Sequence, residues 1–96
     1  MNKICYEERK QVYEAALHVW GQKAQAVVAI EEMSEVIKEI TKALRGQLDR
    51  EHLAEEIADA TIMLEQLRQM FNINDSVCSW MDYKIAALKR MVEKCG

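Results

Sequence analysis

The chain has 96 residues, of which half are hydrophobic and 30% are charged. This balance is typical of one small folded domain and excludes a disordered chain. Proline is absent and glycine occurs three times, which argues against an all-β fold because such folds need turn residues every few positions. The formal net charge of −3 disfavours stable binding to nucleic acid and to anionic membranes.

The cysteines and the N-terminal residues indicate the compartment. Cys5, Cys78 and Cys95 are odd in number, far apart and without a C-x-x-C pattern, as expected of free thiols in a reducing environment. The first ten residues become charged at once and lack the apolar core of a signal peptide. No apolar run approaches the roughly 18 residues of a membrane span. We therefore expect a cytoplasmic protein.

A helical hydrophobic period predicts two helices in the first half of the chain. The first runs from about residue 4 to residue 20, and Gly21 marks a break. The second runs from about residue 22 to residue 45, and Gly46 stands where glycine commonly follows a helix C-terminus. Its expected core stripe is Ala26, Ile30, Met33, Ile37, Ile40 and Leu44.

The same period predicts two further helices. Asp49 is the expected N-cap of the third. Asn74 or Asp75 is expected to cap the start of the fourth, which runs from about Ser76 to Lys94. The core candidates of the third are Leu53, Ile57, Ala60, Leu64, Leu67 and Phe71. Those of the fourth are Val77, Trp80, Met81, Ile85, Leu88 and Val92.

Four helices with short connections predict an all-α fold, a four-helix bundle-like array with a central antiparallel helix hairpin, in one domain over residues 1–96. The central helices also carry apolar residues away from their main stripes, at Val28 and Val36 on one and at Ile62 and Met63 on the other. A helix with two apolar faces expects two packing partners. We therefore predict a homodimer or a homotetramer, against the alternative of a few tolerated surface hydrophobes.

Two acidic pentads stand out on the central helices. Residues 31–35 read Glu-Glu-Met-Ser-Glu and residues 55–59 read Glu-Glu-Ile-Ala-Asp. Residues three apart share a helix face, so Glu32 pairs with Glu35 and Glu56 pairs with Asp59. Like charges this close destabilise an isolated helix, and a divalent cation would offset that cost.

Hairpin geometry brings the two pairs together. Glu35 lies about 12 residues before the expected turn and Asp59 about 12 after it, so both stand about 18 Å up their helices. Glu32 and Glu56 fall within about one turn of the same height. Four carboxylates are therefore expected to converge between two helices, where oxygen ligands suit Mg²⁺, with Mn²⁺ as a substitute.

These residues resemble the all-α NTP pyrophosphohydrolases of the MazG-like and dimeric dUTPase group. That family carries E-E-x-x-E on one helix and E-x-x-D on the next, and here Glu31-Glu32-x-x-Glu35 precedes Glu56-x-x-Asp59. Trp20-Gly21, Gln25 and residues 53–60 also look similar. The likeness covers about residues 15–90.

The resemblance implies a hydrolase that converts a nucleoside triphosphate to the monophosphate and pyrophosphate with Mg²⁺. Its metal ligands would be Glu32, Glu35, Glu56 and Asp59. Glu31 would position water, and Glu31 and Glu35 are the expected catalytic carboxylates. The expected substrate-binding residues are Lys84 and Arg90 for the phosphates and Gln25 for the base.

Two other functions are alternatives to a pyrophosphohydrolase: a non-catalytic interaction module and a di-iron protein. A non-catalytic helical interaction module would carry the same acids as a solvated face. A di-iron bundle needs Glu-x-x-His pairs, and neither His18 nor His52 follows a glutamate at that spacing, so both histidines are expected to be surface or capping groups.

Trp20 is expected in the core.

Overall fold

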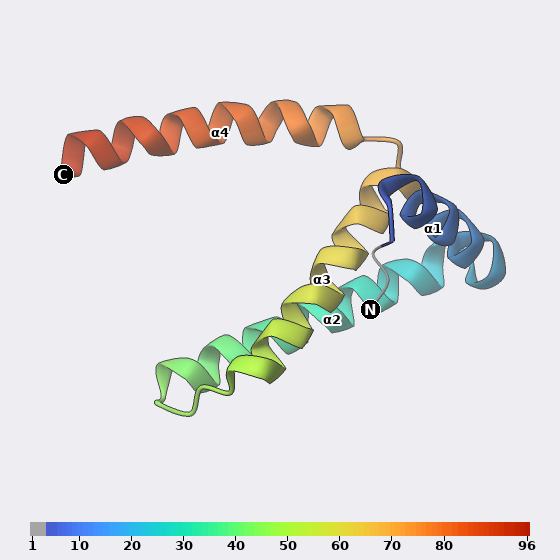
Figure 1. Cartoon of the computed structure of the whole chain (residues 1–96), viewed down its shortest axis with the longest axis horizontal. Helices are drawn as coiled ribbons and strands as arrows, with labels where there is room; N and C mark the ends of the chain where they lie inside the picture. The colour runs from blue at the N-terminus through green and yellow to red at the C-terminus, as the bar shows by residue number, and fades with distance from the viewer. Residues whose placement is uncertain (1–3) are drawn as a thin grey trace.

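The computed structural model describes residues 4–96, which form four α-helices and no strand. Figure 1 shows them in chain order as α1 (Tyr6–Trp20), α2 (Gln22–Leu44), α3 (Arg50–Met70) and α4 (Asn74–Cys95). The all-α prediction is confirmed, and the predicted helix ends agree with the observed ones to within about two residues.

The turn between α2 and α3 is closed by two end motifs that the sequence predicts. Gly46 adopts a left-handed φ of 77°, and the Gln47 N–H donates to the Lys42 carbonyl at 2.9 Å, which is the bond of a Schellman cap. At the start of α3, the Asp49 side chain accepts from the His52 N–H at 3.0 Å. These two caps satisfy backbone groups at both helix ends, and the chain reverses direction within residues 45–49.

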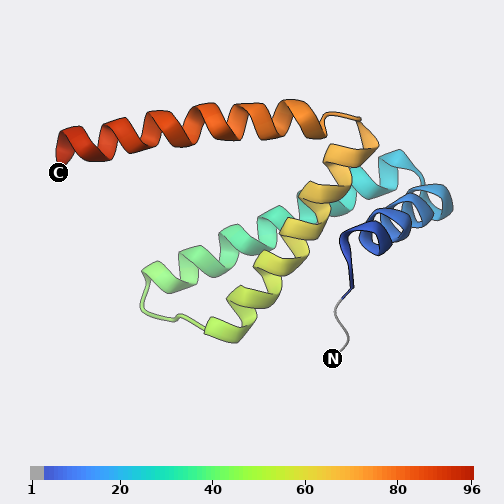
Figure 2. The same cartoon turned by 45° about the horizontal axis from the view of Figure 1, so that its top comes forward.

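The two central helices pack side by side as the expected antiparallel hairpin, as Figures 1 and 2 show from two directions. Ala29 of α2 is 1% exposed, and Ala60 of α3 is also buried. Small side chains at these positions let the two helix backbones approach closely. The other buried residues of the two helices are Gln25, Glu39, Glu56 and Met63.

The face of α2 that meets α3 differs from the predicted core stripe. Ile30, Ile37 and Leu44 are 65%, 64% and 85% exposed, so their assignment to the core of this chain is wrong. They lie roughly 120° around the helix from the centre of the buried residues, at 100° per residue. Val36 is half-buried and Met63 is buried, although both lie off the predicted stripes. The predicted main stripe of α2 is therefore the apolar face that remains uncovered in the single chain.

Helix α1 lies against the open end of the hairpin (Figure 2). Its Tyr13 hydroxyl donates to the Glu65 carboxylate of α3, and Arg9 Nε stands 3.8 Å from the same carboxylate. Burial, together with the Glu65 hydrogen bond and charge, raises the pKa of Tyr13 to about 12. The Gln69 side-chain amide donates to the Lys10 carbonyl at 3.0 Å. These contacts fix α1 on the C-terminal half of α3.

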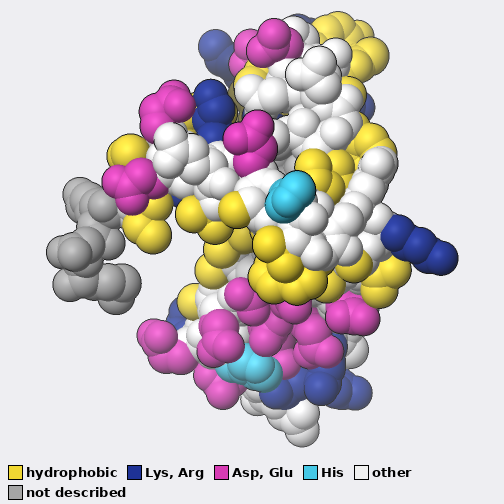
Figure 3. Space-filling model, turned by 90° about the vertical axis from the view of Figure 1, so that its right-hand side faces the viewer, with side chains coloured by type: hydrophobic (Ala, Val, Ile, Leu, Met, Phe, Trp, Pro, Cys, Tyr) yellow, Lys and Arg dark blue, Asp and Glu magenta, His cyan; other side chains and the backbone are white. Residues whose placement is uncertain are grey.

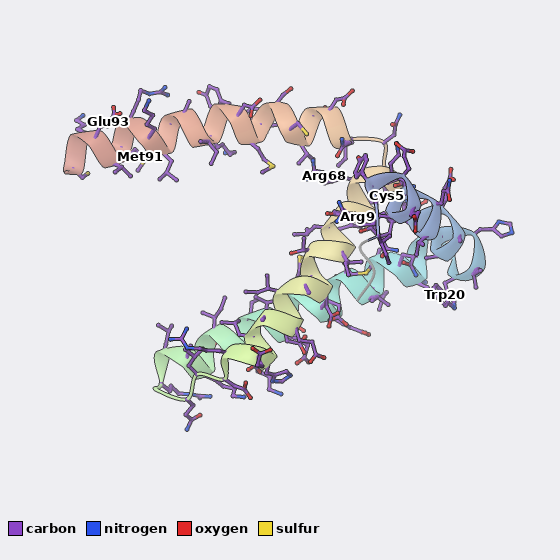
Figure 4. All side chains as sticks on the ribbon, in the orientation of Figure 1. Cys5, Arg9, Trp20, Arg68, Met91 and Glu93 are labelled. Carbon is purple, nitrogen blue, oxygen red and sulfur yellow. The ribbon has the colours of Figure 1, made fainter. Side chains whose placement is uncertain are left out.

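Helix α4 stands apart from the other three helices. Within residues 4–96 it contacts α3 alone, near the turn that joins them, and none of its own residues is buried. In Figure 4 the side chains of Met91 and Glu93 project from α4 with no other helix beside them. The predicted core positions of α4 are therefore not core positions of the single chain, because α4 turns back after α3 but diverges from the hairpin and does not pack along it (Figure 1).

Two simpler expectations concern the cysteines and the membrane. Cys5, Cys78 and Cys95 are free, as predicted, and all three are exposed. Among the helices of residues 4–96, none is long and apolar enough to cross a membrane.

Candidate metal centre

Three carboxylates meet on the hairpin where the sequence places a metal site. Glu32 comes from α2, and Glu56 and Asp59 come from α3. One carboxylate oxygen from each residue lies within 4.8 Å of the others. Glu32 stands three residues after Ala29, on the face that packs against α3, so the close contact at Ala29 carries Glu32 toward its partners. We refer to Glu32, Glu56 and Asp59 as the acidic trio.

The fourth expected ligand, Glu35, borders the acidic trio without belonging to it. Glu35 is half-buried and close enough that its charge raises the pKa of Glu32. Glu31 is exposed, and its backbone carbonyl accepts from the Ser34 hydroxyl at 2.7 Å. The structure therefore brings three of the four expected ligands together and leaves Glu35 and Glu31 at the edge of the group.

The acidic trio concentrates negative charge. The pKa of Glu32 is raised above its ordinary value, first by burial and then by the charges of Asp59 and Glu56. A side-chain hydrogen bond with Asp59 raises this pKa further. A divalent cation would stabilise the same arrangement by opposing the charge. Carboxylate oxygens are the type of ligand that a hard ion such as Mg²⁺ prefers.

A second set of charged and polar side chains, Glu39, Lys42 and His52, lies closer to the hairpin turn than the acidic trio. Glu39 is 2% exposed, and its Oε1 stands 3.3 Å from both Lys42 Nζ and His52 Nδ1. The other ring nitrogen, His52 Nε2, stands 3.2 Å from Oε1 of Glu56. In Figure 3, acidic side chains gather around a histidine on one face of the molecule. A histidine therefore links the buried Glu39 to a member of the acidic trio.

The sequence does not predict this link, because it assigns His52 to the surface or to a cap. Its backbone N–H does bond the Asp49 cap, but its ring contacts two carboxylates. A signal exists in the spacing, since Glu39 follows Glu32 by seven residues and Glu56 follows His52 by four. Both spacings place residues on one helix face.

The expected substrate-binding residues lie away from the acidic trio. Gln25 is buried and borders a small cavity with Tyr13 and Gln69. It precedes Glu32 by seven residues, or about 10 Å along the helix. Lys84 and Arg90 are exposed on α4, which does not contact α2 within the described chain.

Trp20 also differs from expectation. It is 64% exposed and points outward at the end of α1 in Figure 4, because the chain turns at Gly21, whose φ is 86°, and leaves this end of α1 uncovered. The assignment of Trp20 to the core is wrong for the single chain.

Comparisons with protein-family models, with curated proteins and with solved structures each found no match to this chain. The resemblance to the pyrophosphohydrolases therefore depends on residues 31–35 and 56–59 and their flanks.

Proposed function

We propose that this chain is a Mg²⁺-dependent nucleoside triphosphate pyrophosphohydrolase, which uses water to release the nucleoside monophosphate and pyrophosphate from an NTP or dNTP. The observation that carries the proposal is the acidic trio, in which three carboxylates from two helices approach within 4.8 Å. The raised pKa of Glu32 supports it, because a bound cation would reduce the repulsion between these carboxylates that raises this pKa. The resemblance of both acidic motifs to that family supplies the reaction.

Each acidic residue has a role in this proposal. Glu32, Glu56 and Asp59 would hold Mg²⁺, and Glu35 would complete its protein ligands from the edge of the acidic trio. When bound, the ion would neutralise phosphate charge and lower the pKa of a bound water. Glu31 and Glu35 would orient the attacking water, and no covalent nucleophile is required because positioning and charge stabilisation carry most phosphoryl-type catalysis.

The proposal includes a homodimer or homotetramer. An apolar cavity of about 430 Å³ lies between α3 and α4, and its apolar lining includes Leu64, Leu67, Val77 and Met81. A second copy would cover this cavity and the uncovered face of α4. Lys84 and Arg90 do not reach the acidic trio of their own chain, so they would contact phosphates bound by another copy.

The decisive experiment supplies all common NTPs and dNTPs with Mg²⁺ and measures pyrophosphate release. We expect release from at least one nucleotide, and a fall to background for Glu35→Gln and for Asp59→Asn. Glu51→Gln is the matched control, since it removes the same charge from an exposed position in the first turn of α3. The absence of release from every nucleotide would refute the proposed activity.

The uncovered apolar face of α4 favours one alternative, a non-catalytic helical interaction module. This alternative predicts no rise in melting temperature with Mg²⁺, whereas a ligand that binds the folded state alone must raise it. It also predicts unchanged or higher stability in Mg²⁺ when Glu32 and Glu35 are both neutralised, because that change removes repulsion. The enzyme predicts that this double variant loses the stabilisation by Mg²⁺.

A further inference from the structure

Glu39 is a buried carboxylate that the proposed reaction does not use. It is 2% exposed, and its Oε2 has no hydrogen-bond partner among residues 4–96. Burial of a charge in a chain of this size is unfavourable unless partners compensate for it. Its other oxygen, Oε1, contacts Lys42 and His52. The partners of this carboxylate therefore all lie at one of its two oxygens.

His52 connects Glu39 to the acidic trio. Its Nδ1 stands 3.3 Å from Glu39 and its Nε2 stands 3.2 Å from Glu56. The start of α3 is fixed by the bond from the His52 N–H to Asp49, and each ring nitrogen lies within 3.3 Å of a carboxylate oxygen. Glu56 is itself buried at 8% exposed. The rotation of its carboxylate is therefore restricted by a histidine whose own orientation depends on Glu39.

We propose that Glu39 and His52 are positioning residues that hold the Glu56 carboxylate in the orientation in which it binds the cation. This inference rests on the proposed metal centre. Partners behind metal ligands orient those ligands, and their loss typically weakens metal binding about 10- to 100-fold. This role accounts for a carboxylate kept in a buried position where an apolar side chain would cost less. Neither residue contacts the substrate in this role.

The test is a titration of the full chain with Mn²⁺ alone, followed by the electron paramagnetic resonance signal of the free ion. We expect Glu39→Gln and His52→Ala each to raise the dissociation constant about tenfold or more. Because both act through the same contact to Glu56, the double variant should bind about as weakly as the weaker single variant. Circular dichroism and melting without metal establish that each variant is folded.

Two exposed residues supply matched controls. Glu51→Gln removes the same charge from the start of α3, and His18→Ala removes the other histidine of the chain, which is exposed on α1. Both should bind Mn²⁺ as the wild type does. A merely structural role for Glu39 and His52 would lower the melting temperature and leave the dissociation constant of the folded protein unchanged.

The outcomes separate the two proposals. A wild-type chain that binds no Mn²⁺ would refute the metal centre and, with it, the positioning role. A wild-type chain that binds Mn²⁺, with both variants within twofold of it, would refute the positioning role alone. If Glu39→Gln fails to fold, His52→Ala decides, because the His52 side chain is 41% exposed and its removal leaves no large void.

Discussion

Glu32 shows at the scale of one residue how the fold concentrates charge. Its carboxylate faces Asp59 and Glu56 across the hairpin and Glu35 along its own helix. Burial and these charges raise its pKa, whereas in the unfolded chain the same group has its ordinary value near 4.5. The folded protein therefore binds this proton more tightly than the unfolded chain does.

A dependence of stability on pH follows from this difference. A raised pKa contributes stability that is fully present below the unfolded value and is lost as the pH rises through the folded value. In EDTA, Glu32→Gln should therefore raise the melting temperature relative to the wild type more at pH 7 than at pH 4. Glu31→Gln, an exposed neighbour on α2, should show a smaller difference between the two pH values. An equal effect of Glu32→Gln at both pH values would contradict a raised pKa of Glu32 in the folded protein.

The sequence predicts the acidic trio but misses the residues behind it. Glu32, Glu56 and Asp59 follow from spacing and from hairpin height, which depend on regular helix geometry alone. The role of His52 depends on the rotation of two helices about their axes, since its ring reaches Glu39 across the hairpin. Spacing along the chain does not determine that rotation when more than one helix face is apolar.

At the scale of elements, the close approach of α2 and α3 depends on Ala29. This residue is 1% exposed and lies one turn before Glu32. A larger side chain there would separate the two helices and move Glu32 away from its partners.

We expect Ala29→Leu to lower the free energy of unfolding by about 1–3 kcal/mol, as overpacked cores do. It should also weaken Mn²⁺ binding by the folded protein. The measurements are urea unfolding and the same metal titration. Ala54→Leu is the control, because Ala54 is exposed on α3 and should change the unfolding free energy by less than about 0.5 kcal/mol. Equal effects of the two substitutions would contradict the observed packing.

The helix limits are predictable from the sequence, and the packing face of α2 is not. Gly46 readily adopts the positive φ that often follows a helix C-terminus, and the Asp49 side chain can accept from a free N–H at a helix N-terminus. Both properties belong to the residue itself and do not depend on tertiary packing. The stripe that contains Ile30 and Ile37 is more hydrophobic than the face that contains Ala29, so a reading of hydrophobicity selects the wrong face. Close packing of two helices favours a small residue such as Ala29 at the contact. That preference depends on how the two helices approach each other, which the hydrophobicity of one helix does not determine.

At the scale of the whole molecule, the uncovered apolar surface of α4 is the main feature. Trp80, Ile85 and Val92 are exposed, and the cavity between α3 and α4 is lined mainly by apolar side chains. Exposed apolar patches that are contiguous mark interaction sites in folded proteins. The proposed second copy is the simplest occupant, since its own α4 carries the same uncovered face.

We expect Met81→Arg to shift the protein toward a monomer of 11.1 kDa, because it places a charge in the cavity between α3 and α4. Light scattering after size-exclusion chromatography measures the mass. Ser79→Arg is the control, since residue 79 lies roughly on the opposite side of α4 at 100° per residue and should leave the mass unchanged. A wild-type chain that already runs as a monomer would contradict the prediction.

The short connection between α2 and α3 also has a consequence for the order of folding. Contacts between segments that are close in the chain form quickly. The hairpin can therefore close within one chain, at a rate that does not depend on protein concentration. Association through α4 is a bimolecular step. Dilution should therefore slow association and leave the rate of hairpin formation unchanged.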